Sequence, residues 1–227
     1  MDKKLIAKTI DHAVLKPDAT DADVERECGI AMKFDVASVC VKPCHVKLAH
    51  SYLKDADVMV STVIGFPHGG TTTACKVAEA FEAIENGAYE LDMVINIGKL
   101  LSGDYAYVKN DIEAVAKAAH SKNVILKVII ETALLDDEKK KIACRLSEEA
   151  GGDYVKTSTG FNGSGAASND IVLMKNSVGP HIKIKASGGI KTLDQAIGFI
   201  ELGCHRLGTS STEQILTGVD KEDKSLY

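Results

Sequence analysis

The stretch Ile182-Lys183-Ile184-Lys185-Ala186-Ser187-Gly188-Gly189-Ile190 has the pattern of a buried strand that ends at a loop. Apolar side chains alternate with polar ones as far as the serine, and the two glycines then allow a turn. Directly afterwards, Thr192 and Gln195 have the spacing of a capping box, which predicts the start of a helix. A strand, a glycine loop and a capped helix together form one βα unit of a parallel sheet.

The same unit recurs along the whole chain. Short β-rich runs alternate with amphipathic stretches, and the centres of the runs lie roughly 23 to 36 residues apart, which suits a strand, a helix and two loops. Helices are predicted between the runs, for example over Thr73–Asn86 and Tyr105–His120, where apolar residues recur at helical spacing. The predicted strands are Thr9–Leu15, Ala37–Val41, Met59–Ile64, Tyr89–Ile95, Val124–Ile130, Tyr154–Ser158, Ile182–Ala186 and His205–Gly208.

Eight such units favour a closed (β/α)8 TIM barrel, an α/β fold of a single domain, over an open doubly wound sheet. The open sheet binds dinucleotides through G-x-G-x-x-G after its first strand, whereas Lys16-Pro17-Asp18 stands at that place. No linker or low-complexity run divides the chain, so we expect the barrel over residues 1–217. The polar segment 218–227 is expected to be a flexible C-terminal tail.

Composition and charge exclude several classes of function. The 227 residues carry 27 Lys and Arg against 32 Asp and Glu, a net charge of −5, without Trp or a basic cluster, so no nucleic-acid partner is expected. The most apolar stretch, Val124–Ile130, is broken by Lys127, and Met1–Ile10 lacks the apolar core of a signal peptide. We therefore expect no membrane partner. The 6 cysteines form no C-x-x-C pair, which suits reduced thiols in the cytoplasm.

Lysines lie where the strands of a parallel barrel should be apolar. The alternation predicts that Lys156, Lys183 and Lys185 point into the barrel, together with Lys127 and Asp92 from other strands. An ion pair with a barrel carboxylate is the simplest interpretation of any single lysine, and we assign a structural role to Lys127 and Lys183. Lys156 and Lys185 differ, because they lie on consecutive strands near the carboxyl ends, where barrel active sites are found.

The proximity of these two lysines predicts a reactive amine. Two ammonium groups about 5 Å apart in an effective dielectric of about 20 repel each other by roughly 3 kcal/mol, or about two pKa units. With partial burial acting in the same direction, the pKa of one lysine is expected to fall to about 7–8. A neutral amine attacks carbonyl groups and forms a Schiff base, and Asp92 supplies a carboxylate that can move protons. The spacing does not say which lysine is the nucleophile.

Glycine and serine are concentrated in the loops after the last three predicted strands. Barrels that bind phosphosugars commonly form the phosphate site from the loops after strands seven and eight, using backbone N–H groups. The 7 histidines are dispersed, without H-E-x-x-H or a Cys/His cluster, so we expect no metal and no other cofactor. The three loops are Thr157-Ser158-Thr159-Gly160, Ser187-Gly188-Gly189-Ile190 and Gly208-Thr209-Ser210-Ser211.

With these residues in hand, the chain resembles the deoxyribose-phosphate aldolases, a class I (Schiff-base) aldolase family. The resemblance implies a TIM barrel that reversibly cleaves 2-deoxy-D-ribose 5-phosphate to D-glyceraldehyde 3-phosphate and acetaldehyde, in deoxyribonucleotide catabolism and carbohydrate degradation. It spans nearly the whole chain in order. The motifs that carry it are Ile10-Asp11-His12-Ala13-Val14-Leu15-Lys16-Pro17, Ser38-Val39-Cys40-Val41, Glu90-Leu91-Asp92-Met93-Val94, Leu126-Lys127-Val128-Ile129-Ile130-Glu131-Thr132, Val155-Lys156-Thr157-Ser158-Thr159-Gly160-Phe161, Lys185-Ala186-Ser187-Gly188-Gly189-Ile190 and Arg206-Leu207-Gly208-Thr209-Ser210-Ser211.

The resemblance also implies a role for each matching residue. Lys156 resembles the Schiff-base lysine, Lys185 the partner that lowers its pKa, and Asp92 the proton carrier that works with Lys185. The C-terminal Tyr227 resembles a phenol that visits the mouth of the active site and relays a proton. A homo-oligomer, dimer or tetramer, with a small phosphosugar as the other partner is implied as well. The residues implied in phosphate or substrate binding are Gly160, Gly188, Gly189, Gly208, Ser210 and Ser211, with Asp11 and Cys40 near the substrate.

Two alternatives remain open from the sequence. Another Schiff-base or phosphosugar barrel, transaldolase-like or thiazole-synthase-like, would keep the lysine and the phosphate loops but accept other carbonyl donors. A non-catalytic phosphosugar-binding barrel would bind its ligand without forming an imine, and it would leave the inward lysines and Asp92 without a purpose.

Overall fold

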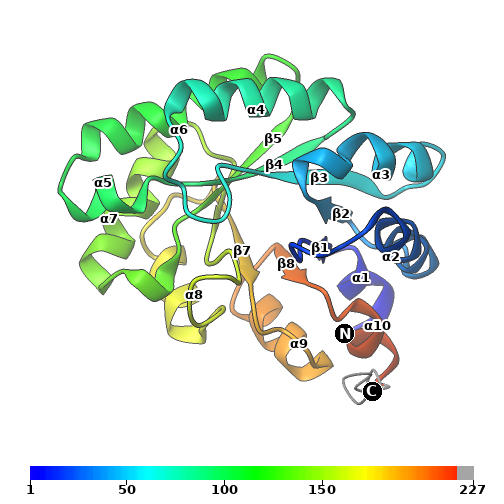
Figure 1. Cartoon of the computed structure of the whole chain (residues 1–227). Helices are drawn as coiled ribbons and strands as arrows, with labels where there is room; N and C mark the ends of the chain where they lie inside the picture. Colours follow the sequence, from blue (N-terminus) through cyan, green and yellow to red (C-terminus); the bar gives the residue numbers. More distant parts are fainter. Residues whose placement is uncertain (219–227) are drawn as a thin grey trace.

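Eight parallel strands close into a barrel, in which each strand pairs with its neighbours in the sequence and β8 pairs with β1 (Figure 1). The computed structural model describes residues 1–218. The (β/α)8 barrel predicted from the repeating units is confirmed. The strands are β1 (Ile10–Val14), β2 (Ser38–Val41), β3 (Met59–Ile64), β4 (Glu90–Val94), β5 (Ile125–Ile129), β6 (Tyr154–Lys156), β7 (Lys183–Ser187) and β8 (Arg206–Thr209).

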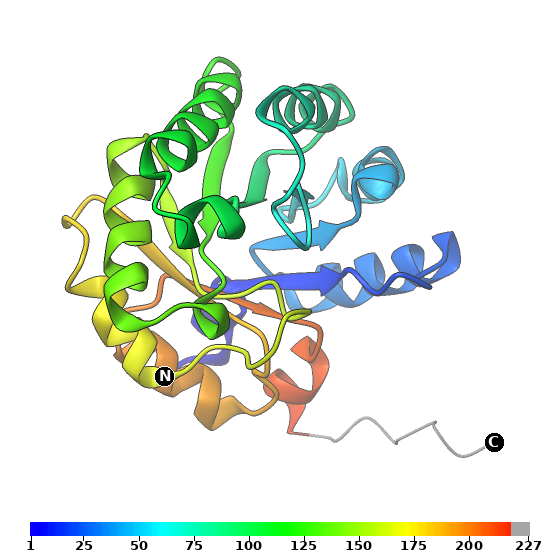
Figure 2. The same cartoon turned by 60° about the vertical axis from the view of Figure 1, so that its left-hand side comes forward.

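Helices surround the strands as an outer ring (Figure 2). α6 has the predicted bounds, α4 ends one residue early, and the predicted capping box of Thr192 and Gln195 begins α9. α10 is the last helix described, and of the expected tail 218–227 only Gly218 lies within the described residues. The helices are α1 (Lys3–Ala7), α2 (Asp21–Phe34), α3 (Val46–Leu53), α4 (Thr73–Glu85), α5 (Ile97–Leu101), α6 (Tyr105–His120), α7 (Asp137–Glu149), α8 (Ser168–Lys175), α9 (Leu193–Glu201) and α10 (Thr212–Thr217), with short 3-10 turns η1 (Pro43–His45) and η2 (Thr132–Leu134).

The strands are buried on both faces, and their alternation separates apolar from polar side chains. In β4, Leu91 and Met93 belong to the hydrophobic core, whereas Glu90 and Asp92 are fully buried and charged. The core packs between the strands and the helical ring, so the barrel interior is the place where buried charges gather. The predicted inward direction of the polar set is confirmed for β4, β5 and β6.

Lys183 was predicted to point into the barrel in a structural role, but the structure leaves its side chain exposed. This lysine is the first residue of β7 and is exposed, with its Nζ 5.5 Å from the ring centroid of Tyr154. It stands at the amino end of its strand, where its ammonium group remains accessible to solvent. β7 itself begins and ends one residue later than predicted, and β6 ends at Lys156 instead of Ser158.

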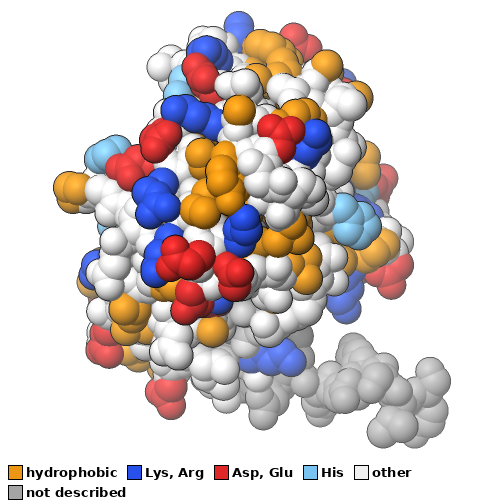
Figure 3. All heavy atoms as spheres, turned by 90° about the vertical axis from the view of Figure 1, so that its left-hand side faces the viewer, with side chains coloured by type: hydrophobic (Ala, Val, Ile, Leu, Met, Phe, Trp, Pro, Cys, Tyr) orange, Lys and Arg blue, Asp and Glu red, His pale blue; other side chains and the backbone are white. Residues whose placement is uncertain are grey.

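The surface on the left of Figure 1, turned toward the viewer in Figure 3, mixes acidic, basic and apolar side chains. No large area of a single charge is visible on this face. Within residues 1–218, no helix is long and apolar enough to cross a membrane.

Candidate functional site

Lys156 and Lys185 lie side by side on β6 and β7, and both reach the same carboxylate oxygen. Their Cα atoms are partners in the parallel register. Lys156 Nζ donates a hydrogen bond to Asp92 Oδ2 at 2.7 Å, and Lys185 Nζ donates to the same oxygen at 2.7 Å. All three side chains are buried. The structure thus brings together the three residues that the sequence singles out for catalysis.

A second group of charged side chains adjoins this trio. We call Glu90, Lys127 and Arg206 the inner cluster. Lys127 Nζ donates to Glu90 Oε2 at 2.5 Å and to Asp92 Oδ1 at 3.0 Å, and Arg206 Nη2 donates to Glu90 Oε1 at 2.7 Å. The structural role predicted for Lys127 fits these ion pairs. Arg206 was not predicted to lie in the interior, although the alternation of β8 around Leu207 carried the signal.

Asp11 on β1 joins the inner cluster to Lys185. Its carboxylate accepts hydrogen bonds from Lys185 Nζ and from Arg206 Nη1, and it lies 3.3 Å from Lys127 Nζ. Asp11 is fully buried, and attraction to these three cations outweighs the effect of burial, so its pKa is lowered. Lys185 therefore has two carboxylate partners, whereas Asp92 is the only carboxylate bonded to Lys156 among the described residues.

This asymmetry separates the pKa values of the two lysines. Burial lowers the pKa of Lys156, and repulsion from Lys185 adds to it, so that the attraction of Asp92 does not restore the ordinary value. Burial acts in the same direction on Lys185, but Asp11 and Asp92 together raise its pKa. Lys156 is thus the better source of a free amine, and Lys185 remains an ammonium ion.

Asp92 stays ionised beneath these cations. Burial alone would raise the pKa of its carboxyl group, but Lys127, Lys156 and Lys185 together lower it well below the usual range. A carboxylate that accepts a hydrogen bond from an amine and from an ammonium ion at one oxygen can pass a proton between them. Acid, base and nucleophile therefore meet at this point.

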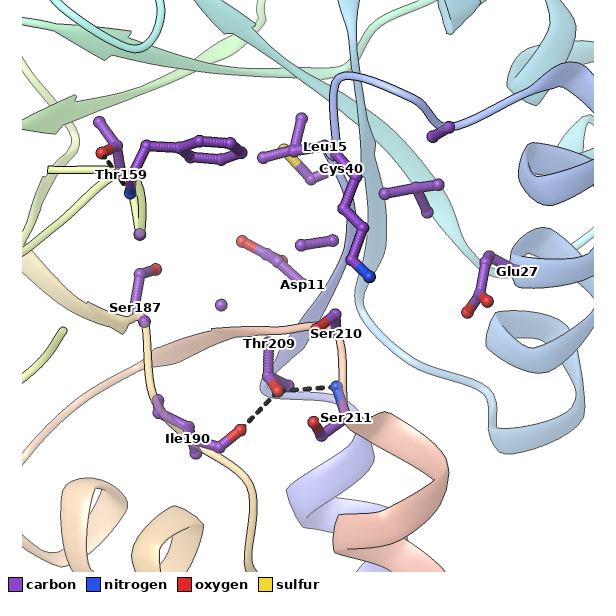
Figure 4. A pocket seen from close by; sticks show the side chains of 18 of the residues that line it. Asp11, Leu15, Glu27, Cys40, Thr159, Ser187, Ile190, Thr209, Ser210 and Ser211 are labelled. Carbon is purple, nitrogen blue, oxygen red and sulfur yellow. Dashed lines mark hydrogen bonds between the residues drawn. The ribbon is translucent and has the colours of Figure 1, made fainter. Parts of the chain in front are cut away.

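A cavity of about 570 Å³ opens beside the two lysines, at the carboxyl ends of β1, β6, β7 and β8 (Figure 4). Asp92 does not line it and contacts it only through the lysines. Lys16, Arg26 and Glu27, which were not predicted as site residues, also line it. The predicted residues that do line it are Asp11, Cys40, Lys156, Gly160, Lys185, Gly188, Gly189, Gly208, Ser210 and Ser211.

The loops after β7 and β8 present backbone donors to this cavity. Gly188 and Gly189 have φ values of +88° and +76°, in the left-handed region that favours glycine. The N–H groups of Gly189 and Ser210 have no hydrogen-bond acceptor among the described residues. Thr209 joins the two loops, because its Oγ1 donates to the Ile190 carbonyl at 2.7 Å and accepts from the Ser211 N–H at 2.9 Å (Figure 4). Free donors held at a fixed spacing suit an anion.

The loop after β6 is anchored by Glu131, which sequence reasoning did not single out. Glu131 is fully buried, has a φ of +56°, and accepts hydrogen bonds from the Thr159 N–H at 3.1 Å and from Asn162 Nδ2 at 3.0 Å. Asn162 Nδ2 also donates to the Pro67 carbonyl at 3.1 Å. These bonds fix the backbone that carries Gly160 to the cavity. Only the position of Glu131 next to a predicted strand could have indicated it.

Two further predicted site residues are Cys40 and Tyr227. Cys40 is buried at the cavity wall, where burial and the nearby charge of Asp92 raise the pKa of its thiol. Tyr227 lies outside the described residues. Within residues 1–218 no group of three or more His, Cys, Asp or Glu side chains could hold a metal ion.

The sequence matches the model of the DeoC/LacD family aldolases over residues 5–211. It is 55% identical over 215 residues to the deoxyribose-phosphate aldolase of Thermococcus gammatolerans, covering 94% of this chain and 96% of that protein. It is 49% identical over 216 residues to the deoxyribose-phosphate aldolase of Clostridium kluyveri, covering 95% of this chain and 99% of that protein.

Solved structures of deoxyribose-phosphate aldolases share this fold. A deoxyribose-phosphate aldolase described as putative, from Coccidioides immitis, superimposes with a TM-score of 0.92 at 42% identity, covering 96% of this chain and 87% of that one. A tetrameric deoxyribose phosphate aldolase from Aeropyrum pernix superimposes with a TM-score of 0.90 at 30% identity, covering 96% of this chain and 92% of that one.

Proposed function

This chain belongs to the DeoC/LacD family of aldolases, and on that premise we propose that it reversibly cleaves 2-deoxy-D-ribose 5-phosphate into D-glyceraldehyde 3-phosphate and acetaldehyde through a Schiff base on Lys156. The observation that carries the proposal is the unequal environment of two adjacent lysines on one carboxylate. Lys156 has a lowered pKa, and Lys185, beside Asp11, has a raised one. The substrate is inferred from relatives that are 55% and 49% identical over nearly their full length and are named deoxyribose-phosphate aldolase.

The first half of the reaction uses Lys156 as nucleophile. Its amine attacks the aldehyde carbon of the open-chain sugar, and loss of water gives a protonated imine. A base then removes the proton from the 3-hydroxyl group, the C2–C3 bond breaks, and its electron pair moves into the imine to form an enamine. D-Glyceraldehyde 3-phosphate leaves at this stage. The imine serves as the electron sink.

The second half returns protons to the enamine. Lys185, as an ammonium ion, and the Asp92 carboxylate that contacts both amines provide the acid and the base, with protons passing through water where the substrate is out of direct reach. Protonation at C2 gives the imine of acetaldehyde. Water then adds to this imine and releases acetaldehyde, which leaves Lys156 free again.

The phosphate group of the substrate is assigned to the wall of the cavity that the loops after β7 and β8 form. The free N–H groups of Gly189 and Ser210 and the serine hydroxyls of the β8 loop suit three anionic oxygens. Gly160 and Gly188 complete this wall in the proposal, with Gly208 beside them. Asp11 and Cys40 stand nearer the lysines, on the side where the aldehyde end of the sugar would lie.

Assembly, location and the chain terminus are also proposed. The tetrameric relative from Aeropyrum pernix supports a homo-oligomer for this chain, a dimer or a tetramer. A cytoplasmic location fits the substrate and the scattered cysteines. We keep Tyr227 as a proton relay to the enamine: its deletion is expected to lower turnover several-fold, measured against unchanged acetaldehyde trapping and thermal stability.

Reductive trapping tests the proposed function. Incubation with acetaldehyde and borohydride should add one ethyl group to Lys156, detected by mass spectrometry of proteolytic fragments. Modification of Lys185 or Lys127 instead would reject the assignment of the nucleophile. Trapping only with larger ketones would favour a transaldolase-like enzyme, and phosphosugar binding without any trapping would favour a non-catalytic barrel.

A further inference from the structure

Ser187, the last residue of β7, has a buried hydroxyl group without a hydrogen-bond partner in the described part of the chain. The residue is 3% exposed and lines the cavity. Its backbone is held on both sides, because its N–H donates to Thr157 Oγ1 at 3.0 Å and its carbonyl accepts from the Ala166 N–H at 3.0 Å. A buried hydroxyl normally finds a partner, since leaving it unpaired is costly.

The neighbouring strand makes room for this hydroxyl. A Cβ atom at Gly208 would lie 2.2 Å from Ser187 Oγ and 3.3 Å from Lys185 Cε, so no side chain fits at Gly208 while Ser187 and Lys185 keep their places. The φ of Gly208 is not in the left-handed region, so this close approach, and not the backbone conformation, is what requires glycine here. The chain therefore keeps both an unpaired hydroxyl and the space beside it.

The position of Ser187 matches the middle of the proposed substrate. Ser187 follows Lys185 by two residues on the same face of β7, about 7 Å along the strand, and it precedes Gly188 and Gly189 directly. In Figure 4 its side chain stands between Thr159 and Ile190 at the edge of the cavity that Asp11 faces. Rotation about one side-chain dihedral moves Oγ between the Gly208 side and the cavity.

We infer that Ser187 is a specificity residue that forms a hydrogen bond with the substrate hydroxyl next to the phosphorylated CH2 group, an inference that rests on the proposed aldolase function. With the phosphate at the Gly188–Gly189 loop, this is the first hydroxyl of the substrate to reach the serine. In 2-deoxy-D-ribose 5-phosphate it is the 4-hydroxyl, which becomes the 2-hydroxyl of D-glyceraldehyde 3-phosphate. Ser187 thereby distinguishes hydroxylated acceptors from acceptors that lack this group.

Two acceptors measured in the synthetic direction test this inference. With acetaldehyde held constant, kcat/KM is determined for D-glyceraldehyde 3-phosphate and for 3-oxopropyl phosphate, the same aldehyde without the hydroxyl. Ser187→Ala is expected to lower kcat/KM about tenfold for the first acceptor and by less than about twofold for the second, the loss of one hydrogen bond. Ser187→Cys keeps the approximate size of the side chain, but its thiol forms weak hydrogen bonds. Its ratio of kcat/KM for the two acceptors should therefore lie between that of the wild type and that of Ser187→Ala.

Ser158→Ala is the matched control. Ser158 Oγ is also buried and unpartnered among the described residues, but Ser158 does not line the cavity, so the ratio of the two acceptors should stay at the wild-type value. Equal losses on both acceptors in Ser187→Ala and Ser187→Cys would make the serine structural and overturn the inference. Wild-type kcat/KM values for both acceptors in these two variants would overturn it too. Failure of the proposed aldolase function would appear separately, as absence of acetaldehyde trapping on wild-type Lys156.

Discussion

The barrel interior holds the same chemical groups in two different settings. Lys156 lines the cavity and is bonded to Asp92 alone among the carboxylates of the described residues, whereas Lys127 is fully buried and lies within 3.3 Å of three carboxylates. The pKa of Lys156 is lowered and that of Lys127 is raised well above the ordinary value, although burial acts to lower both. What differs is the number of carboxylates around each ammonium group.

The difference shows how one strand geometry can supply both stability and reactivity. Carboxylates of β4 and β1 surround Lys127 and Arg206 of the inner cluster, so the charges compensate one another. At the cavity, Lys156 and Lys185 donate hydrogen bonds to the same oxygen of Asp92. Of these two lysines, only Lys185 also donates to Asp11. Among the carboxylates of the described residues, Lys156 therefore has only Asp92 to stabilise its ammonium form. Burial then favours its neutral form.

The largest expected effect separates activity from stability. Lys156→Met should abolish acetaldehyde trapping and lower turnover by about a thousandfold or more, because the amine that forms the imine is gone. Its free energy of unfolding should change little, since Asp92 keeps Lys127 and Lys185 as partners. Turnover assays and urea unfolding of the same preparation check both halves. Retained trapping would move the nucleophile to another residue.

The same substitution in the inner cluster should have the opposite consequence. Lys127→Met leaves Glu90, Asp11 and Asp92 with one cation fewer in a fully buried setting, and removal of one partner from such a group costs about 3–5 kcal/mol. We expect a loss of stability in that range, measured by urea unfolding. A loss below about 1 kcal/mol would mean that the inner cluster does not stabilise the barrel.

A smaller effect is expected at the phosphate wall. A Cβ at Gly189 would have no atom within 4 Å, but a φ of +76° strains any residue except glycine, so Gly189→Val is expected to shift the free N–H group of residue 189 from its place at the cavity. KM should rise about tenfold or more for 2-deoxy-D-ribose 5-phosphate, while kcat/KM for unphosphorylated deoxyribose should stay near the wild-type value. Steady-state kinetics on both sugars decide the matter. Equal losses on both would indicate a distorted loop instead of a lost phosphate contact.

Much of the fold could be predicted, because alternation within each strand and helical spacing between strands are local patterns. The inward direction of Lys156, Lys185 and Asp92 followed from this alternation. The choice of nucleophile did not, because it depends on Asp11, which pairs with Lys185 and raises its pKa. Asp11 comes from β1, which pairs with β8, the neighbour of β7, only when the barrel closes.

The errors come from features that the alternation within one strand does not contain. Lys183 has the right parity to point inward, but it stands at the first position of its strand, where water remains accessible. Glu131 was missed because it follows a strand in a loop, and its partners Thr159 and Asn162 lie far along the chain. The alternation of side chains in one strand does not show how far along the barrel axis a residue lies. It also does not show which loops contact each other.

The pH dependence of acetaldehyde trapping at Lys156 tests most directly whether the environment of this lysine makes it reactive. Trapping requires the neutral amine, so its rate should rise as the amine loses its proton, with a midpoint below the ordinary lysine value of 10.5. In Lys185→Leu the midpoint should move upward, because the repelling ammonium group is gone while Asp92 remains. Mass spectrometry of the trapped fragment against pH gives both midpoints. A wild-type midpoint at or above 10.5, unmoved in the variant, would contradict the proposed coupling of the two lysines.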